Sequence, residues 1–200
     1  GFEVHSSIPH RGVSAVHEGA RLIQWATEQN ELNGAATPGP LASMFDPAYT
    51  TWHVGIISGG TADNITAKDC HFNMGYRAVP GDDTARLNEM YFDKVNEVKA
   101  AMQAVHPEAD IVLTPRFAVP PLKPEEGGEA EGLVRAVTGD NAAHVVSYGT
   151  EAGQFQDAGY SAVVCGPGDI AQAHQPNEFI EVAQFEAGHQ FMCELLAKLA

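Results

Sequence analysis

The stretch Thr50-Thr-Trp-His-Val-Gly-Ile-Ile-Ser58 decides the fold of the first half of this chain. It is rich in β-branched and aromatic residues, which favour a strand, and the pair Gly59-Gly60 ends it. A second run of similar character, from Cys70 to Val79, predicts another strand of the same sheet.

Helical patterns lie on both sides of these strands. A first helix is expected from about Val13 to Glu31, and a second begins at Thr84, which we expect to cap it, and ends before Pro107. An extended stretch at 1–6 and a strand at 110–118 complete the order β-α-β-β-α-β. This order is the split βαβ arrangement, so we expect an α/β fold that begins with a ferredoxin-like domain.

A domain boundary is expected just after this set of elements. Residues 119–128 contain three prolines, two adjacent glycines and two adjacent glutamates, which break helices and strands alike. We therefore divide the chain into domains at 1–118 and 119–200. The second domain should contain a helix at 128–137, strands at 144–147 and 161–165, and a final helix. That helix has one apolar face, which needs a sheet to cover it: Val182, Phe185, His189, Met192, Leu196 and Leu199.

The composition excludes several classes of partner. The 200 residues include 26 acidic and 11 basic side chains, for a formal charge of -15, which would repel phosphate backbones and anionic membranes. There is no run of about 20 apolar residues and no secretory leader, so we expect a cytoplasmic protein that binds neither nucleic acid nor membrane. The three cysteines are widely spaced and fit no disulfide framework; we expect them to be buried.

The most informative motif is Cys165-Gly-Pro-Gly-Asp-Ile-Ala-Gln-Ala-His-Gln-Pro-Asn-Glu178. It places a glycine-rich turn after a predicted strand and ends with His174 beside Pro176. A histidine held at a strand end can serve as a metal ligand. Taken alone, a loop histidine is more often solvated or a capping residue.

This motif, together with Ser147-Tyr-Gly-Thr-Glu-Ala152, resembles the C-terminal signature of acetylornithine deacetylases. These enzymes belong to the di-zinc family of deacetylases, aminoacylases and carboxypeptidases. The resemblance covers nearly the whole chain and implies that residues 1–118 are a dimerisation, or lid, domain and that 119–200 are the C-terminal part of an α/β zinc-hydrolase catalytic domain. It also implies that His174 is a zinc ligand.

The resemblance assigns roles to three residues of the first domain. Gly1-Phe-Glu-Val-His5-Ser-Ser-Ile-Pro9 is similar to the motif whose histidine stabilises the oxyanion in the neighbouring subunit's site, which makes His5 catalytic. Asn64 matches the asparagine of a substrate-binding Gly-Gly turn, although it could equally cap that turn. Arg77 matches an arginine suited to grip a substrate carboxylate, but Gly75 stands where the family has an acidic residue.

Three further residues match a turn that binds substrate: Gly149, Thr150 and Glu151. A Gly-Thr turn at a strand end is also common for geometric reasons alone. Glu151 could select the ammonium group of N-acetylornithine electrostatically, or it could simply be a surface residue at a helix start.

The remaining metal ligands and the general base of the family are not found in this sequence. In the family these groups are a His-x-Asp segment, a bridging aspartate, a Glu-Glu pair and another aspartate. A zinc site takes about three protein ligands, so a single histidine cannot form one. We therefore expect two zinc ions, or cobalt, per complete site, with most ligands outside this chain, and a fragment that is inactive alone.

The function implied by the resemblance is metal-dependent deacetylation of N-acetylornithine, in arginine biosynthesis, by a homodimer. The alternatives are a related N-acyl amino acid hydrolase or dipeptidase, and a non-catalytic dimerisation or binding module.

Overall fold

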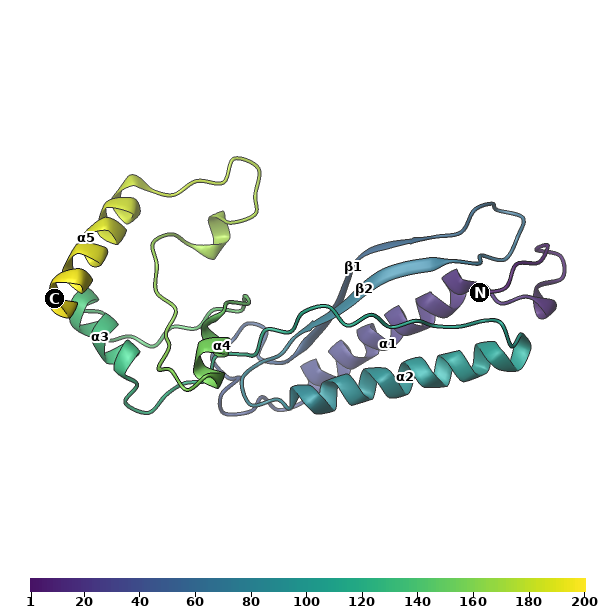
Figure 1. Ribbon diagram of the computed structural model, residues 1–200, viewed down its shortest axis with the longest axis horizontal. Coiled ribbons are helices and arrows are strands. Elements are labelled where there is room, and N and C mark those ends of the chain that lie inside the picture. Colours follow the sequence, from purple (N-terminus) through teal and green to yellow (C-terminus); the bar gives the residue numbers. More distant parts are fainter. The chain divides into compact units, whose positions relative to one another are not determined.

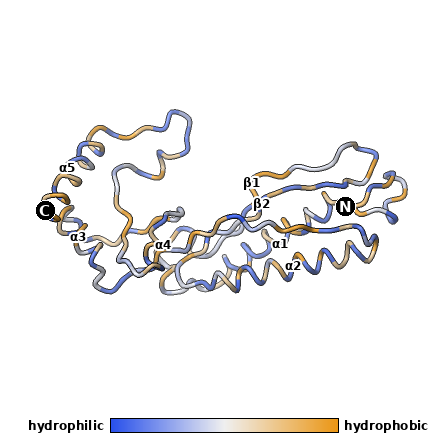
Figure 2. Tube along the Cα trace, viewed as in Figure 1, coloured by the Kyte–Doolittle hydropathy of each residue, from blue (hydrophilic) through white to orange (hydrophobic).

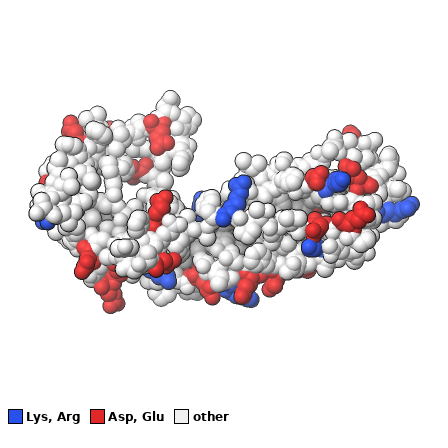
Figure 3. Space-filling model, in the orientation of Figure 1, with Lys and Arg blue, Asp and Glu red and all other residues white.

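The computed structural model describes residues 1–200 and divides them into two compact units. Unit 1 comprises Gly1–Ala118 with Val146–Tyr148, and unit 2 comprises Val119–Val145 with Gly149–Ala200. Acidic side chains outnumber basic ones on the surface shown in Figure 3, as the net charge requires. None of the helices combines the length and the apolar character that crossing a lipid bilayer requires.

Unit 1 is built from two strands and two long helices (Figure 1). The strands β1 (Thr51–Gly59) and β2 (Cys70–Arg77) form an antiparallel pair, and the helices are α1 (Ala15–Ala35) and α2 (Thr84–Val105). A short 3-10 turn, η1 (Pro9–Arg11), precedes α1. The α/β class is confirmed, and both predicted helices and both central strands form within a few residues of their expected bounds.

The helices cover one face of the strand pair. Exposure alternates along β2, where Phe72, Met74 and Tyr76 are partly buried and the residues between them are exposed. These side chains pack against two buried clusters. The first consists of Val13, Leu22, Val95, Val98, Met102 and Ala109, and the second of Trp25, Ala26 and Trp52. Figure 2 shows the matching alternation of hydrophobic and hydrophilic positions along α1 and α2.

Two asparagines of α1 occupy the outer edge of β1. Asn30 donates from Nδ2 to the carbonyl oxygen of Trp52 at 2.9 Å and accepts at Oδ1 from the Trp52 amide at 2.6 Å. Asn33 donates to the carbonyl oxygen of Thr50 at 2.7 Å. The backbone groups of Trp52 therefore point away from β2, and side chains satisfy them where another strand would otherwise be needed.

The edge of β1 beyond these asparagines has no such cover. The register of the pair shifts between Val54 and Ile57, which marks a bulge. At the bulge the side chains of Ile56 and Ile57 are 76% and 48% exposed. This half of the edge is thus both unpaired and apolar.

Two details of unit 1 differ from the sequence prediction. The cap of α2 is Asp83, whose carboxylate accepts from the amides of Ala85 and Arg86 at 2.9 and 3.2 Å; Thr84 is the first helical residue. The predicted strand at 110–118 was wrong: the segment has no strand pairing. Pro115 interrupts it and cannot donate a hydrogen bond to a neighbouring strand.

The opening stretch at 1–6 is tied to the rest of unit 1 by isolated bridges rather than by a regular strand. Phe2 pairs with Val13, and His5 pairs with Ile65. The Thr66 hydroxyl donates to the carbonyl oxygen of Phe2 at 2.8 Å and accepts from the amide of Val4 at 2.8 Å.

Unit 2 contains helices but no strand. Its elements are α3 (Glu129–Thr138), α4 (Ala152–Asp157), the 3-10 turn η2 (Ile170–Gln172) and α5 (Val182–Leu199). The final helix packs on α3, yet none of its residues is buried, so its apolar face is uncovered. The strands predicted at 144–147 and 161–165 were wrong for these 200 residues, because a strand needs a hydrogen-bonded neighbour and unit 2 has none.

The expectation that the cysteines are buried was also wrong. Cys165 and Cys193 are exposed, and Cys70 is only partly buried. The first two lie in unit 2, which encloses little core.

Candidate functional site

His5 and Asn64 lie next to each other at the loop end of the strand pair. The amide of Ser6 donates to the carbonyl oxygen of Asn64 at 2.9 Å, and His5 forms a bridge with Ile65. Both His5 and Asn64 are exposed. The structure therefore brings together two residues that are 59 positions apart in the sequence and leaves both side chains accessible to a ligand.

The imidazole of His5 is held by the turn that follows it. Its Nδ1 atom lies 2.8 Å from the Ser7 hydroxyl and accepts from the Ser7 amide at 3.2 Å. The amide of Ile8 also donates to the carbonyl oxygen of His5 at 3.0 Å, which closes the turn.

Arg77 lies away from this pair. It is the last residue of β2 and pairs with Thr51, whereas the loop that carries Asn64 leads into Cys70 at the other end. Arg77 is seven positions along β2 from Cys70, a span of about 23 Å at the usual rise per residue. The exposed guanidinium makes no hydrogen bond or ion pair, so it is free to bind an anion, but not at the same point as His5 within one chain.

His174 occupies a strained loop in unit 2. Its φ angle is 57° and that of Asn177 is 61°, in the left-handed region that few residues other than glycine adopt. The amide of His174 donates to the Glu178 carboxylate at 2.9 Å, and the amide of Glu178 donates to the carbonyl oxygen of Gln175 at 3.1 Å. Such strain, held by local hydrogen bonds, often marks a functional site.

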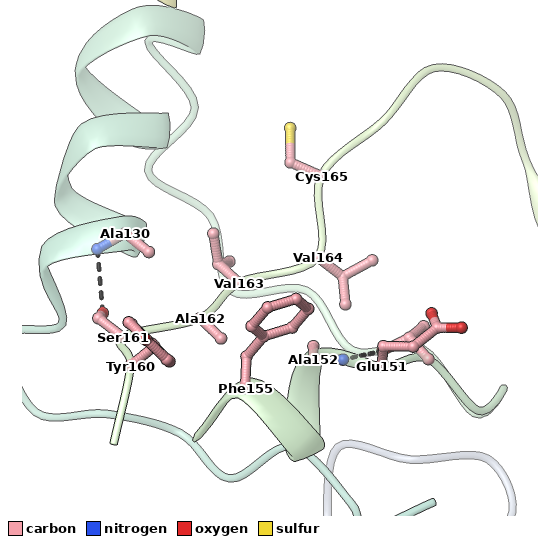
Figure 4. Close-up of a pocket in the computed structure, with 11 residues that line it drawn as sticks. Ala130, Glu151, Ala152, Phe155, Tyr160, Ser161, Ala162, Val163, Val164 and Cys165 are labelled. Atoms are coloured by element: carbon pink, nitrogen blue, oxygen red, sulfur yellow. Dashed lines mark hydrogen bonds between the residues drawn. The ribbon is translucent and has the colours of Figure 1, made fainter. Parts of the chain in front are cut away.

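Thr150 and Glu151 line a concave pocket of about 550 Å³ in unit 2 (Figure 4). Phe155 and a run of small apolar residues, 162–165, form much of the remaining wall. Gly149 and His174 are not among the lining residues. Figure 4 shows the ring of Phe155 inside the pocket and the carboxylate of Glu151 turned away from that ring.

One hydrogen-bonded carboxylate was missed by the sequence prediction. Glu125 accepts from the Ser161 hydroxyl at 2.5 Å, from Gln156 Nε2 at 3.0 Å and from the Ala162 amide at 3.1 Å. These hydrogen bonds hold the pKa of the Glu125 carboxyl below its usual range, and the bond from Ser161 has the largest effect. The carboxylate ties the proline-rich segment to the wall of the pocket, and its only sequence signal was the Glu125-Glu126 pair.

The residues present do not form a metal site on their own. No group of three or more His, Cys, Asp or Glu side chains is arranged to hold a metal ion. His174 offers one accessible imidazole, which is the right chemistry for zinc but only one of about three protein ligands.

Comparison with known proteins defines the class to which this chain belongs. The profile of the M20 peptidase dimerisation domain matches residues 1–103, which include α1, β1, β2 and most of α2. The chain belongs to the M20 peptidase dimerisation-domain family.

Curated relatives extend this similarity over both units. The chain is 32% identical over 182 residues to the acetylornithine deacetylase of Myxococcus xanthus, a match that covers 91% of the chain and 46% of the relative. It is 30% identical over 203 residues to the acetylornithine deacetylase of Yersinia pestis, covering 96% of the chain and 47% of the relative. The chain thus spans about half the length of the curated relatives it matches.

Solved structures agree on the fold. A tripeptidase from Staphylococcus aureus subsp. aureus Mu50 superposes with a TM-score of 0.67 at 18% identity, over 97% of this chain and 48% of that one. The aminopeptidase PepT from Bacillus cereus ATCC 10987 gives a TM-score of 0.51 at 20% identity, over the same shares.

Proposed function

We propose that this chain is part of an M20 hydrolase that removes the acetyl group from N-acetylornithine. The observation that carries the proposal is the similarity to acetylornithine deacetylase, which reaches across 91% of the chain and so includes both the dimerisation domain and the motif around His174. Zinc or cobalt as the metal, a cytoplasmic location and a role in arginine biosynthesis are further parts of the proposal that follow from the family resemblance.

Unit 1 would supply groups that bind the reacting carbonyl. An exposed imidazole can donate a hydrogen bond to the oxygen on which negative charge develops when water adds to the acetyl carbon. His5 would take this role, and the adjacent Asn64 would donate to the substrate from its amide. Arg77, which has no partner in the chain, would bind the α-carboxylate. Its distance from His5 means that the two would reach the substrate from different directions or serve different sites.

Unit 2 would supply the remaining groups of this chain. The strained loop supports His174 as a metal ligand, since the hydrogen bond to Glu178 fixes its backbone. The pocket beside Thr150 and Glu151 supports a substrate-binding role for both residues, with Gly149 leaving room at the turn. The metal, when bound, would supply Lewis-acid activation of water.

A homodimer through the first domain is part of the proposal, and the open half of the β1 edge is the surface we assign to it. Residues 54–59 carry unpaired backbone groups and the exposed side chains of Ile56 and Ile57, whereas Asn30 and Asn33 block the other half. Two such edges related by a two-fold axis could pair with each other.

The test uses the full-length product of the gene that encodes this chain. We expect it to hydrolyse N-acetylornithine and to be slower on N-acetyl amino acids without a side-chain ammonium and on dipeptides. His5→Ala should lower kcat by about a hundredfold, the usual effect of losing one oxyanion donor, while metal content is unchanged. His10→Ala is the control, because His10 is another exposed histidine five positions away. If a dipeptide is hydrolysed faster than N-acetylornithine, the proposed substrate is wrong and a dipeptide takes its place.

The second candidate is a dimerisation or binding module without chemistry. The absence of any three-ligand group in the structure favours it for this polypeptide taken alone. Metal analysis of the full-length product separates the two candidates, since a module without chemistry would hold no stoichiometric zinc or cobalt.

A further inference from the structure

The hydrogen bonds at His5 determine which ring nitrogen carries the proton. A backbone amide can only donate, so the Ser7 amide at 3.2 Å requires Nδ1 of His5 to be an acceptor. The Ser7 hydroxyl, at 2.8 Å from the same atom, can donate a second hydrogen bond to it. A neutral imidazole that accepts at Nδ1 has its proton on Nε2.

The other ring nitrogen is left without a partner. Nothing in the chain hydrogen-bonds to Nε2 of His5, and the side chain is exposed. The backbone on both sides of His5 is also held, because the Ser6 amide donates to the carbonyl oxygen of Asn64 and the Ile8 amide donates to the carbonyl oxygen of His5. The ring is thus fixed at one nitrogen and open at the other.

We infer that Ser7 is a positioning residue that selects the Nε2–H tautomer of His5 and so presents a neutral hydrogen-bond donor to a ligand oxygen. The value of this selection for catalysis rests on the proposed function, in which His5 stabilises an oxyanion. The opposite tautomer would present a lone pair to that oxygen and repel it. The tautomer itself depends only on contacts within this chain.

The tautomer can be measured by NMR on the 200-residue chain labelled with 15N. The bare and the protonated nitrogen of a neutral imidazole resonate far apart, so the spectrum is recorded at an alkaline pH of about 8.5. His10 is exposed and has no ring hydrogen bond, so it gives the unbiased tautomer ratio in the same spectrum. Two hydrogen bonds at Nδ1 predict a ratio of Nε2–H to Nδ1–H at His5 that is roughly fivefold or more above that of His10.

Variants separate the hydroxyl from the rest of the turn. Ser7→Ala should move the His5 ratio towards that of His10, because only the backbone bond remains, and Ser7→Thr should restore it. Ser6→Ala is the matched control, since its hydroxyl makes no hydrogen bond and its loss should leave the ratio unchanged. Backbone amide spectra check that each variant keeps its fold.

Two results would overturn the inference: a wild-type ratio at His5 equal to that of His10, or a ratio that Ser7→Ala and Ser6→Ala change equally. A separate result tests the proposed function. If the ratio responds as expected but His5→Ala in the full-length product keeps its activity, the tautomer selection stands and the catalytic role of His5 falls. If both hold, Ser7→Ala should lower kcat and leave KM nearly unchanged.

Discussion

The hydrogen bonds between Asn30 and the backbone of Trp52 offer a test of how helix α1 holds the edge of the sheet. Asn30→Ala removes a donor at 2.9 Å and an acceptor at 2.6 Å. Trp52 is only 4% exposed, so its amide and carbonyl would be left poorly solvated. Each net hydrogen bond contributes about 0.5–1.5 kcal/mol, which gives a loss of about 1–3 kcal/mol for the pair.

Helix propensity opposes this loss. Alanine is more favourable than asparagine inside a helix by up to about 0.7 kcal/mol, so the expected net destabilisation is roughly 0.3–2.3 kcal/mol, centred a little above 1 kcal/mol. For an m-value of about 1.5 kcal/mol/M in urea, the midpoint should fall by about 1 M. Asn33→Ala, which removes the single bond to Thr50, should have a clearly smaller effect, because the same gain in helix propensity then offsets a loss of only about 0.5–1.5 kcal/mol.

Tryptophan fluorescence reports this unfolding from unit 1 alone, because both tryptophans of the chain, Trp25 and Trp52, lie there. Gln24→Ala is the matched control: Gln24 is exposed on the same helix and its only hydrogen bond is a 3.4 Å contact with Glu28. It should change the stability by less than about 0.5 kcal/mol. Equal midpoints for Asn30→Ala and Gln24→Ala would refute the reasoning.

Three other outcomes are expected. The 200-residue chain alone should not hydrolyse N-acetylornithine with zinc or cobalt added, and turnover by material free of longer contaminants would contradict this. Ile56→Asp at the open edge of β1 should shift sedimentation of the chain from dimer to monomer, whereas Phe92→Asp on the exposed side of α2 should not; equal effects would rule out the edge as the interface. Mixing inactive His5→Ala and His174→Ala full-length proteins should restore about a quarter of wild-type activity, because half the random dimers are mixed and each has one complete site. No recovery in proven mixed dimers would mean that His5 does not act across the dimer.

The sequence alone was enough to predict the parts of the molecule that depend on local interactions. The spacing of apolar residues at three and four positions predicted α2 and α5 closely, because a helix makes its hydrogen bonds within itself. The runs around Trp52 and Phe72 predicted β1 and β2, which pair with each other inside this chain. The motifs around His5 and His174 were enough to predict the family, which the comparisons confirm.

Only the tertiary structure decided features that depend on a distant partner. The runs at 110–118, 144–147 and 161–165 have strand composition but no hydrogen-bonded neighbour among these residues, and composition cannot supply one. The distances among the candidate residues were equally hidden: His5 meets Asn64 through a bridge, while Arg77 lies at the far end of β2. The direction of hydrogen bonds could not be predicted from the sequence either, because the tautomer inferred for His5 depends on the contacts of the Ser7 amide and hydroxyl with its ring. A sequence lists donors and acceptors, but only their placement in space decides which of them meet.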